Sequence, residues 1–309
     1  MMKKVIIDCD VGVDDAFALI LAFHSPELEV KAVTGVNGNV PLSQVFENIQ
    51  KVLSLIHPPH KPLIAKGADH PLKGNPVYAH SVHGKDGLGG AKIELKKGEE
   101  FWEYISRPAD ELITTLAHQD PNELILIATG PLTNLALALQ KDPAGMKKLK
   151  EISIMGGAIR TKGNVTPDAE FNVFSDPLAA QKVFKSGLPI TLVPLDVTHQ
   201  VFLTPQWIEE RLQPIHNSFS QFVIEAIGYD ITAHRFLRSS DHIYLHDPLA
   251  VAVVIDPTLV RTEPLSLDVN IQEGEHYGHM TEVSGRSKID VCLEVDSERF
   301  LDLFLSRLR

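Results

Sequence analysis

The sequence predicts an α/β fold in which a single open, mostly parallel sheet carries helices on both faces. Short β-branched runs alternate with amphipathic stretches of helical length, which is the pattern of parallel strands joined by crossover helices. No internal repeat, low-complexity tract or Pro/Ser-rich linker interrupts this alternation. With 309 residues and 44% hydrophobic content the chain can bury a large core. We therefore expect residues 1–309 to form one domain.

The expected elements follow in chain order. They are a strand at 5–7 with a helix at 16–24, a strand at 30–33 with a helix at 43–56, a strand at 124–128 with a helix at 132–139, and further strands at 152–155 and 190–193. Residues 67–90 are rich in Gly, His and Pro and predict a long loop. Residues 218–242 predict a helix that runs into a polar connection. In an open α/β sheet, ligands bind beyond the carboxyl ends of the strands, so functional side chains are expected there.

Charge and cysteine content limit the possible partners and location. The chain has 29 basic and 40 acidic residues, a net charge of −11, which argues against a surface for nucleic acid or for an anionic membrane. Cys9 and Cys292 lie in no metal-type spacing, so a disulfide framework or a zinc site is not expected. The first apolar run stops at Asp8, too early for a signal peptide, and no stretch predicts a membrane span. We expect a soluble, cytoplasmic protein.

The strongest local signal is the acidic motif I-I-D-C-D-V-G-V-D-D-A at residues 6–16. A predicted strand runs directly into Asp8 and Asp10, and Asp14 and Asp15 open a helix. Either of the last two alone is explained as a helix cap or a first-turn acid. Four carboxylates within eight positions, however, repel one another unless protons or cations intervene. Carboxylate oxygens suit Ca²⁺ or Mg²⁺, and such an ion can activate water. The motif therefore predicts a metal-dependent hydrolase.

A second motif, T-G-P-L-T-N-L-A-L-A-L, occupies residues 129–139. Thr129 stands where a predicted strand ends, so its carbonyl and hydroxyl groups are expected to face the ligand side of the sheet. An ordinary strand-to-helix turn, with Pro131 near the first helical turn, explains the same residues equally well. Read alone, this segment decides neither for nor against a functional role.

A third motif joins I-M-G-G-A to G-N-V-T-P-D-A-E-F-N-V at residues 163–173. Met155 ends a predicted strand, and the two following glycines allow close backbone approach. Three polar residues are expected in a loop ahead of a helix that starts near Asp176: Asn164, Glu170 and Asn172. Asn and Glu suit sugar hydroxyls because they offer hydrogen-bond donors and acceptors. Individually, a turn residue or a surface acid is the simpler explanation for each.

Histidines mark the last two motifs. In Y-L-H-D-P-L-A-V-A-V-V-I, His246 and Asp247 are expected just before an apolar helix, where Asp247 is also explained as a helix cap. An imidazole there is a possible proton donor near neutral pH. In H-S-V-H-G-K-D-G-L-G-G, His80 and His83 lie in the predicted long loop, beside glycines that could serve as the hinge of a lid. Loop histidines of this kind are usually only solvated.

Together, in this order, the five motifs resemble the inosine–uridine nucleoside hydrolase family of nucleoside N-ribohydrolases. The resemblance covers nearly the whole chain, from the aspartate motif to His246 and Asp247. It implies an open α/β protein with one Ca²⁺ at the bottom of its pocket, which splits a ribonucleoside and water into ribose and a free base. The implied partners are small ribonucleosides, with no nucleic acid and no membrane, and the implied assembly is a homodimer or homotetramer.

The resemblance also implies a role for individual residues. The implied calcium ligands are Asp10, Asp15, the carbonyl of Thr129, and Asp247. Asp10 is further implied as the general base for the attacking water, and His246 as the proton donor to the leaving base. The implied ribose contacts are Asp14 at the 2′-hydroxyl, Asn39, Asn164, Glu170 and Asn172, with Met155 beneath the sugar. His83 is implied as a lid residue, and Asp8 as a support for the loop.

The chemistry agrees with this assignment. Cleavage of an N-glycosidic bond passes through an oxocarbenium-like ribosyl cation, which a carboxylate-rich pocket stabilises. One position departs from the family: Val11 stands where its members usually have proline. Loss of that proline removes a fixed φ angle. Because every carboxylate remains, we expect metal binding to be retained.

Two other functions and the base preference remain open at the level of sequence. A haloacid dehalogenase-type phosphatase also uses D-x-D after a strand, but the Asp14–Asp15 pair and His246–Asp247 fit it poorly. A non-catalytic calcium- or sugar-binding protein on the same fold is the other alternative. Base contacts are expected in residues 222–238, which include Tyr229, His234 and Arg235. Pyrimidine or broad specificity is slightly favoured.

Overall fold

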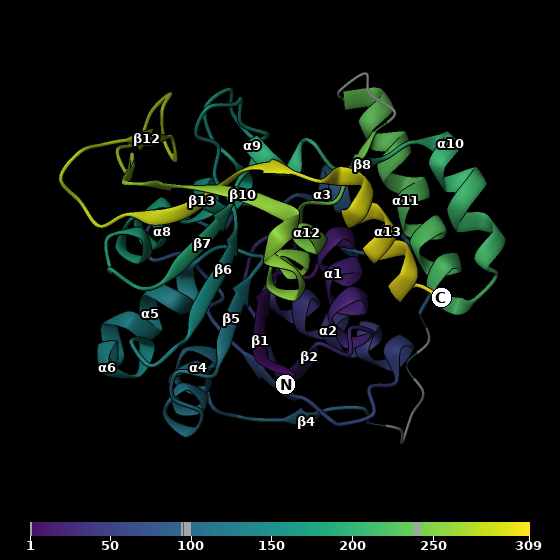
Figure 1. Ribbon diagram of the computed structural model, residues 1–309, viewed down its shortest axis with the longest axis horizontal. Helices are drawn as coiled ribbons and strands as arrows, with labels where there is room; N and C mark the ends of the chain where they lie inside the picture. Colours follow the sequence, from purple (N-terminus) through teal and green to yellow (C-terminus); the bar gives the residue numbers. More distant parts are fainter. Residues whose placement is uncertain (1, 94, 96–99, 238–241) are drawn as a thin grey trace.

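Nine strands form one large sheet in the order β10-β13-β7-β6-β5-β1-β2-β3-β4 (Figure 1). This computed structural model describes residues 2–93, 95, 100–237 and 242–309, with backbone only for 229–237. The strands are β1 (Lys3–Cys9), β2 (Leu28–Gly35), β3 (Leu63–Lys66), β4 (Glu103–Tyr104), β5 (Ile125–Ala128), β6 (Glu151–Met155), β7 (Ile190–Val193), β10 (Val260–Leu265) and β13 (Ile289–Val295). All neighbours pair in parallel except β10 and β13, which are antiparallel.

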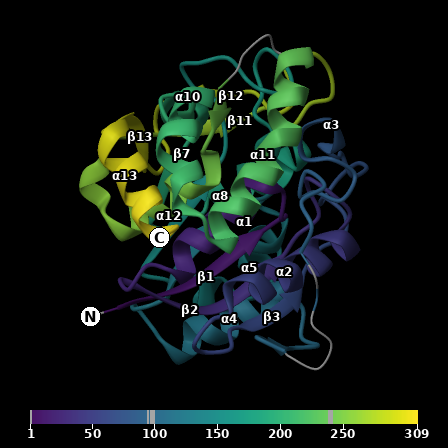
Figure 2. The ribbon, with the colours of Figure 1, turned by 90° about the vertical axis from the view of Figure 1, so that its right-hand side faces the viewer.

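Helices cover both faces of this sheet (Figures 1 and 2). One layer contains α1 (Val13–Phe23), α2 (Leu42–Ile56), α11 (Ser218–Leu237), α12 (His246–Ile255) and α13 (Ser297–Arg307). The other contains α4 (Ala109–Gln119), α5 (Thr133–Lys141), α6 (Pro143–Met146) and α8 (Pro177–Phe184). Side chains of β1 alternate between the two layers: Val5 and Ile7 pack in the first and Ile6 in the second. The predicted α/β class, with helices on both faces of a mostly parallel sheet, is therefore confirmed.

Shorter elements connect these layers. They are α3 (His80–His83), α7 (Phe171–Ser175), α9 (Leu195–Thr198), α10 (Pro205–Trp207), a π-helical turn (Ile208–Leu212), two 3₁₀ turns (Gln213–Ile215 and Pro257–Leu259), and the two-stranded sheets β8 (Phe202–Leu203) with β9 (Ile243–Tyr244) and β11 (Leu267–Val269) with β12 (Met280–Glu282). No helix among the described residues is long and apolar enough to cross a bilayer.

The structure corrects the expected start of two helices and adds a third helix where a loop was expected. The first helix begins at Val13 rather than near residue 16, because Asp14 and Asp15 occupy its acidic first turn. The short helix α7 interrupts what the sequence predicts as a loop: Glu170 caps it by accepting backbone N–H bonds. His246 and Asp247 lie in the first turn of α12, whose N-cap is Leu245, so they do not precede the helix.

The parallel register brings the carboxyl ends of the central strands to one edge of the sheet. Pairing of β1 with β5 and of β5 with β6 sets Asp8, Ala128 and Ile154 side by side. The residues that follow these strands therefore meet at this edge, although they are far apart in sequence. The segments with the predicted functional side chains leave the sheet here.

Candidate active site

A cavity of about 380 Å³ opens at this edge of the sheet. Its wall combines apolar side chains with a smaller number of polar groups, the usual composition of a small-molecule site. Val77 and Tyr78, from the segment before α3, are partly exposed and belong to the lining. The polar members of the lining include Asp14, Asn39, His83, Thr129, Asn164, Glu170, Asn172, His246 and Asp247.

Two aspartates with no contact to the cavity surface are completely buried beside it. Asp10 follows β1, and its Oδ2 accepts a hydrogen bond of 2.7 Å from the backbone N–H of Asn39. Its Oδ1 is buried and has no hydrogen-bond partner among the described residues. Asp15 accepts bonds of 2.8 Å from the N–H of Gly12 and 2.7 Å from the hydroxyl of Thr129. The carboxylate of Asp15 is thus well satisfied, whereas that of Asp10 is not.

Asp14 and Asp247 connect two helices that are distant in sequence. The backbone N–H of Asp247 donates a bond of 2.9 Å to Oδ2 of Asp14. Each residue is the second of its helix, α1 or α12, and these two helices pack against each other. The carboxylate of Asp14 therefore lies where the N-terminal ends of two helices meet, and the positive ends of both helix dipoles favour an anion there.

The buried carboxyl groups strongly perturb one another. Burial raises the pKa of Asp10, Asp15 and Asp247, and for Asp10 and Asp247 the negative charge of Asp15 is the next largest cause. Hydrogen bonds, including one to Asp247, partly offset this rise in the pKa of Asp15. The described lining of the cavity contains no lysine or arginine that could compensate these charges. Protons or a cation must do so instead.

These carboxylates fit a hard divalent cation. The buried Oδ1 of Asp10, which has no partner among the described residues, is a ligand atom without a competing hydrogen bond. The carbonyl of Thr129 accepts from Nδ2 of Asn172 at 2.7 Å, and its second lone pair remains available. Because these donors are all oxygen atoms, they favour a hard ion such as Ca²⁺ over a soft metal.

Amide and carboxylate groups from α7 form one wall. Nδ2 of Asn172 also donates to the carbonyl of Met155 at 3.2 Å, which ties the helix to the end of β6. The carboxylate of Glu170 accepts three backbone N–H bonds, at 2.8 Å from Asn172, 2.8 Å from Gly157 and 3.1 Å from Val173. Burial nevertheless raises the pKa of Glu170. These bonds fix the orientation of both side chains before any ligand arrives.

Two histidines stand on other parts of the wall. Nδ1 of His246 lies 2.7 Å from the hydroxyl of Thr198, at the end of α9. Nδ1 of His83 accepts a bond of 3.2 Å from the backbone N–H of Val13, at the start of α1. An imidazole nitrogen that accepts from an N–H carries no proton, so the proton of neutral His83 is on Nε2.

Comparison with known proteins places this site in a family. Residues 5–302 match the family model described as inosine-uridine preferring nucleoside hydrolase. The chain belongs to this family. It is a nucleoside N-ribohydrolase, as the resemblance in its motifs implied, and the phosphatase alternative is set aside.

Relatives of this nucleoside hydrolase match it along their full length. The pyrimidine-specific ribonucleoside hydrolase RihA of Klebsiella pneumoniae is 38% identical over 100% of this chain and 99% of that protein. A plant nucleoside hydrolase, PpNRh1, has a structure with a TM-score of 0.93 at 34% identity over 100% of this chain and 99% of its own. The purine-preferring ribonucleoside hydrolase of Gardnerella vaginalis has a TM-score of 0.90 at 33% identity over 99% and 98% of the two chains.

The cavity lining of this nucleoside hydrolase contains the metal-ligand, ribose-contact, lid and proton-donor residues that the resemblance implied, except Asp10 and Asp15, which are buried beside it. Met155 is in the lining, at the end of β6. Asp8 is not in the lining. Its Oδ1 accepts bonds from the hydroxyl of Thr34 and, at 2.8 Å, from Nδ2 of Asn134, and burial raises its pKa to about 7. It thereby links the ends of β1 and β2 to the first turn of α5.

Sequence reasoning missed some residues of the nucleoside hydrolase site. Thr198, which contacts His246, follows the strand β7, so the rule that functional groups follow strands could have found it. Gly38 gave no signal: a Cβ there would lie 2.0 Å from Oδ2 of Asp10, so only glycine permits the close approach. The side chains proposed for base contacts, Tyr229, His234 and Arg235, lie outside the described residues.

Proposed function

We propose that this nucleoside hydrolase cleaves the N-glycosidic bond of ribonucleosides in a calcium-dependent reaction, by attack of water through an oxocarbenium-like transition state. The observation that carries the proposal is the fully buried Asp10, whose Oδ1 has no hydrogen-bond partner among the described residues and which lies beside a cavity lined with sugar-binding groups. Such a carboxylate can accept a proton from an attacking water molecule.

The calcium ion would be held by Asp10, Asp15, the carbonyl of Thr129, and Asp247. Their shared burial and the rise in the three carboxyl pKa values support this set, because a divalent cation compensates the repulsion that otherwise requires protons. When bound, the ion supplies positive charge that keeps the carboxylates ionised and lowers the pKa of water at the site. The hydrogen bond from Asn39 holds Oδ2 of Asp10 and leaves Oδ1 directed to other partners.

The polar wall would bind the ribose. Asp14 would accept the 2′-hydroxyl, and four neighbours would bind the remaining hydroxyls: Asn39, Asn164, Glu170 and Asn172. The backbone bonds to Glu170 and the bonds from Asn172 to Thr129 and Met155 hold these groups in place, so little side-chain entropy is lost on binding. Met155 would lie under the sugar. Negative charge on this wall would stabilise the ribosyl cation as the bond breaks.

His246 would donate a proton to the leaving base. The hydroxyl of Thr198 contacts Nδ1 of the ring and thereby fixes the orientation of the imidazole in the cavity wall. His83, on α3, would serve as a lid residue over the pocket. The N–H of Val13 holds its ring in position. Both histidines belong to the cavity lining, which supports their placement near a bound nucleoside.

We further propose pyrimidine or broad base specificity. The 38% identical relative from Klebsiella pneumoniae, matched end to end, is described as pyrimidine-specific, and this supports the preference. A structural relative from Gardnerella vaginalis is described as purine-preferring, at 33% identity. Broad specificity is therefore kept within the proposal. Rates with uridine, cytidine, inosine and adenosine distinguish pyrimidine specificity from broad specificity.

The test is a reducing-sugar assay on ribonucleosides and their 2′-deoxy counterparts, with and without a calcium chelator. We expect release of ribose from ribonucleosides, much slower release of deoxyribose because Asp14 loses its hydroxyl partner, and loss of activity on chelation with recovery on added calcium. Binding of ribonucleosides without release of base would favour the non-catalytic alternative. Full activity in chelator would overturn the calcium dependence alone.

Three further proposals concern the whole protein. We propose one domain, because the two apolar clusters pack on opposite faces of the same sheet. We propose a cytoplasmic location, because Cys9 and Cys292 are both free and buried, as suits a reducing compartment. We propose a homodimer or homotetramer, which light scattering on a size-exclusion column measures directly.

A further inference from the structure

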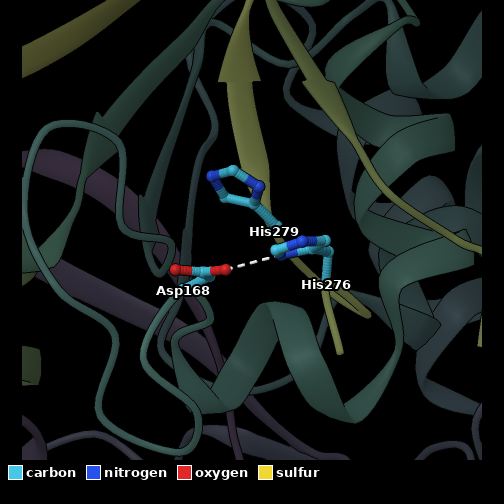
Figure 3. A group of neighbouring side chains, drawn as sticks. All are labelled: Asp168, His276 and His279. Atoms are coloured by element: carbon cyan, nitrogen blue, oxygen red, sulfur yellow. Dashed lines mark hydrogen bonds and ion pairs between the residues drawn. The ribbon is translucent and has the colours of Figure 1, made fainter. Parts of the chain in front are cut away.

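Three metal-binding side chains from two separate segments meet outside the cavity (Figure 3). Asp168 lies in the segment between β6 and α7, whereas His276 and His279 lie in the connection between β11 and β12. Oδ2 of Asp168 is 2.6 Å from Nδ1 of His276. One donor atom from each of the three side chains lies within 4.8 Å of the other two. None of the three lines the cavity, and the proposed function does not use them.

Backbone contacts hold both segments in place. The hydroxyl of Thr166 accepts the N–H groups of Asp168 and Ala169, at 3.3 and 3.0 Å, which fixes the turn that presents the carboxylate. The turn that carries both histidines is closed by a bond of 3.1 Å from the N–H of His279 to the carbonyl of His276. The two imidazole centroids are 5.9 Å apart. The two turns therefore hold the three donor side chains close together without a bound ion.

We propose that Asp168, His276 and His279 form a second metal site, for a divalent transition-metal ion of the zinc type. Two imidazoles and one carboxylate, with water in the fourth position, are a usual ligand set for Zn²⁺. Metal–ligand bonds of about 2.1 Å in a tetrahedron put ligand atoms roughly 3.4 Å apart. The distance from Asp168 to His276 is 2.6 Å, and all three donor atoms lie within 4.8 Å of one another. The tetrahedral value falls between these two distances, so small side-chain rotations would bring the donors into coordinating positions.

Metal binding at this site would replace a direct contact between two of the ligands. In the structure Nδ1 of His276 lies 2.6 Å from Oδ2 of Asp168. A bound ion would lie between these atoms, and the imidazoles would bind it in their neutral form. Ca²⁺ prefers oxygen ligands and does not suit two imidazoles, so this site and the calcium site proposed above select different ions. Because the site contains no cysteine, the spacing of the cysteines gave no sign of it.

The site would brace one wall of the cavity. Asp168 stands two residues before Glu170, the cap of α7. The histidine-bearing turn already packs on α7, since the rings of Tyr277 and Phe174 make an edge contact at 5.5 Å. A bound ion would add a strong link between these two segments. We expect it to restrict the segment before α7 without contact to the substrate.

The experiment measures zinc stoichiometry on the calcium-loaded protein. Protein equilibrated in a zinc buffer is separated from free metal, and its zinc is quantified. We expect the wild type to hold one more equivalent than the double variant His276→Ala/His279→Ala. The control is His118→Ala, which removes a similarly exposed His–Asp pair, 2.7 Å from Asp142, that joins no third donor among the described residues. Equal zinc in the wild type and the double variant overturns the proposal.

Two further measurements separate the metal site from a folding defect. Asp168→Asn keeps the shape of the side chain, so we expect native circular dichroism but zinc affinity lower by at least about tenfold. In the wild type, zinc should slow amide hydrogen exchange at 163–169 and 274–279, and in the double variant it should not. Unchanged affinity in Asp168→Asn excludes the carboxylate as a ligand. Zinc binding with unchanged exchange overturns the bracing of the wall.

Discussion

The two oxygens of the Asp10 carboxylate have different surroundings. Oδ2 is bound by the backbone N–H of Asn39, whereas Oδ1 is buried and has no hydrogen-bond partner among the described residues. A buried charged oxygen without a partner costs free energy, so its presence points to a ligand, a proton or a cation that the site is built to receive. This asymmetry distinguishes Asp10 from Asp15, whose oxygens are both hydrogen-bonded.

Replacement of this one carboxylate should abolish the reaction. We expect Asp10→Asn to lower kcat for uridine and inosine by about 10³-fold or more, because both the general base and one metal ligand are lost. Initial rates with both nucleosides measure the effect. Asp302→Asn, an exposed acid on α13 paired with Arg211, is the control and should keep wild-type rates. Activity of Asp10→Asn close to the wild type would remove Asp10 from the mechanism.

His246 allows a test that depends on the leaving group. If it protonates the base, His246→Ala should slow inosine by about 10²-fold or more. The same variant should affect p-nitrophenyl riboside far less, because nitrophenolate leaves without a proton. The ratio of the two losses in kcat/KM is the measurement, and His216→Ala, at an exposed position, is the control. Equal losses on both substrates would contradict this role.

At the scale of elements, the contact between β12 and the segment after β6 is very close. Gly157 has a φ of +84°, and a Cβ there would lie 2.3 Å from the sulfur of Met280. Met280 is buried, so its side chain can move aside only by displacing neighbouring core atoms. The small sheet β11–β12 is thereby held against the wall that contains Glu170, whose carboxylate accepts the N–H of Gly157.

Gly157→Ala should therefore destabilise the protein. We expect a loss of about 2–4 kcal/mol in the free energy of unfolding, from the left-handed backbone and the overpacking together. Urea unfolding followed by circular dichroism measures it. The control is Gly228→Ala in α11, where a Cβ meets no atom of the described residues within 4 Å and helix propensity predicts a gain of up to about 1 kcal/mol. If Gly157→Ala did not lower the free energy of unfolding relative to the Gly228→Ala control, the packing argument would be contradicted.

Elements and site residues differed in how far the sequence could predict them. Hydrophobic periodicity found the central strands and the helices α1, α2, α5 and α11, but not α4 or α13. The rule of strand ends led to Asp10, Thr129 and Met155. The five-residue helix α7 was not predicted, because its stability depends on the cap by the Glu170 side chain rather than on a periodic pattern. The role of Gly38 was not predicted, because it depends on the close approach of Asp10 in three dimensions. Beyond residue 256 no strands were proposed, although β13 lies between β7 and β10.

At the scale of the whole molecule, calcium and pH should act together on stability. Burial raises the pKa of Asp10, Asp15 and Asp247, and that of Asp8 to about 7. Because these folded-state values exceed the unfolded value of about 3.9, folding takes up protons. The calcium-free protein therefore loses stability as pH rises from about 4 through 7. Calcium requires ionised carboxylates, so its binding strengthens over the same range.

The rise in Tm caused by calcium should accordingly grow from about pH 5 to about pH 8. At about a hundredfold excess over Kd the gain is about 2.7 kcal/mol, or roughly 5 °C for a protein of this size. Thermal unfolding followed by fluorescence, with calcium or with chelator at each pH, gives the measurement. Asp10→Asn should show little of the gain. A gain that is constant or falls with pH would contradict the proposed ligands.

The hydrogen bond between Asp14 and the N–H of Asp247 joins residues 233 positions apart. During synthesis on a ribosome, the first half of the site emerges long before the second, and its crowded acids have no partner from α12 to complete their surroundings. Until residue 247 has left the exit tunnel, the nascent chain lacks part of the cavity wall and one of the proposed calcium ligands. The reaction thus becomes possible only late in translation, and a polypeptide that terminates early cannot act on the nucleoside pool.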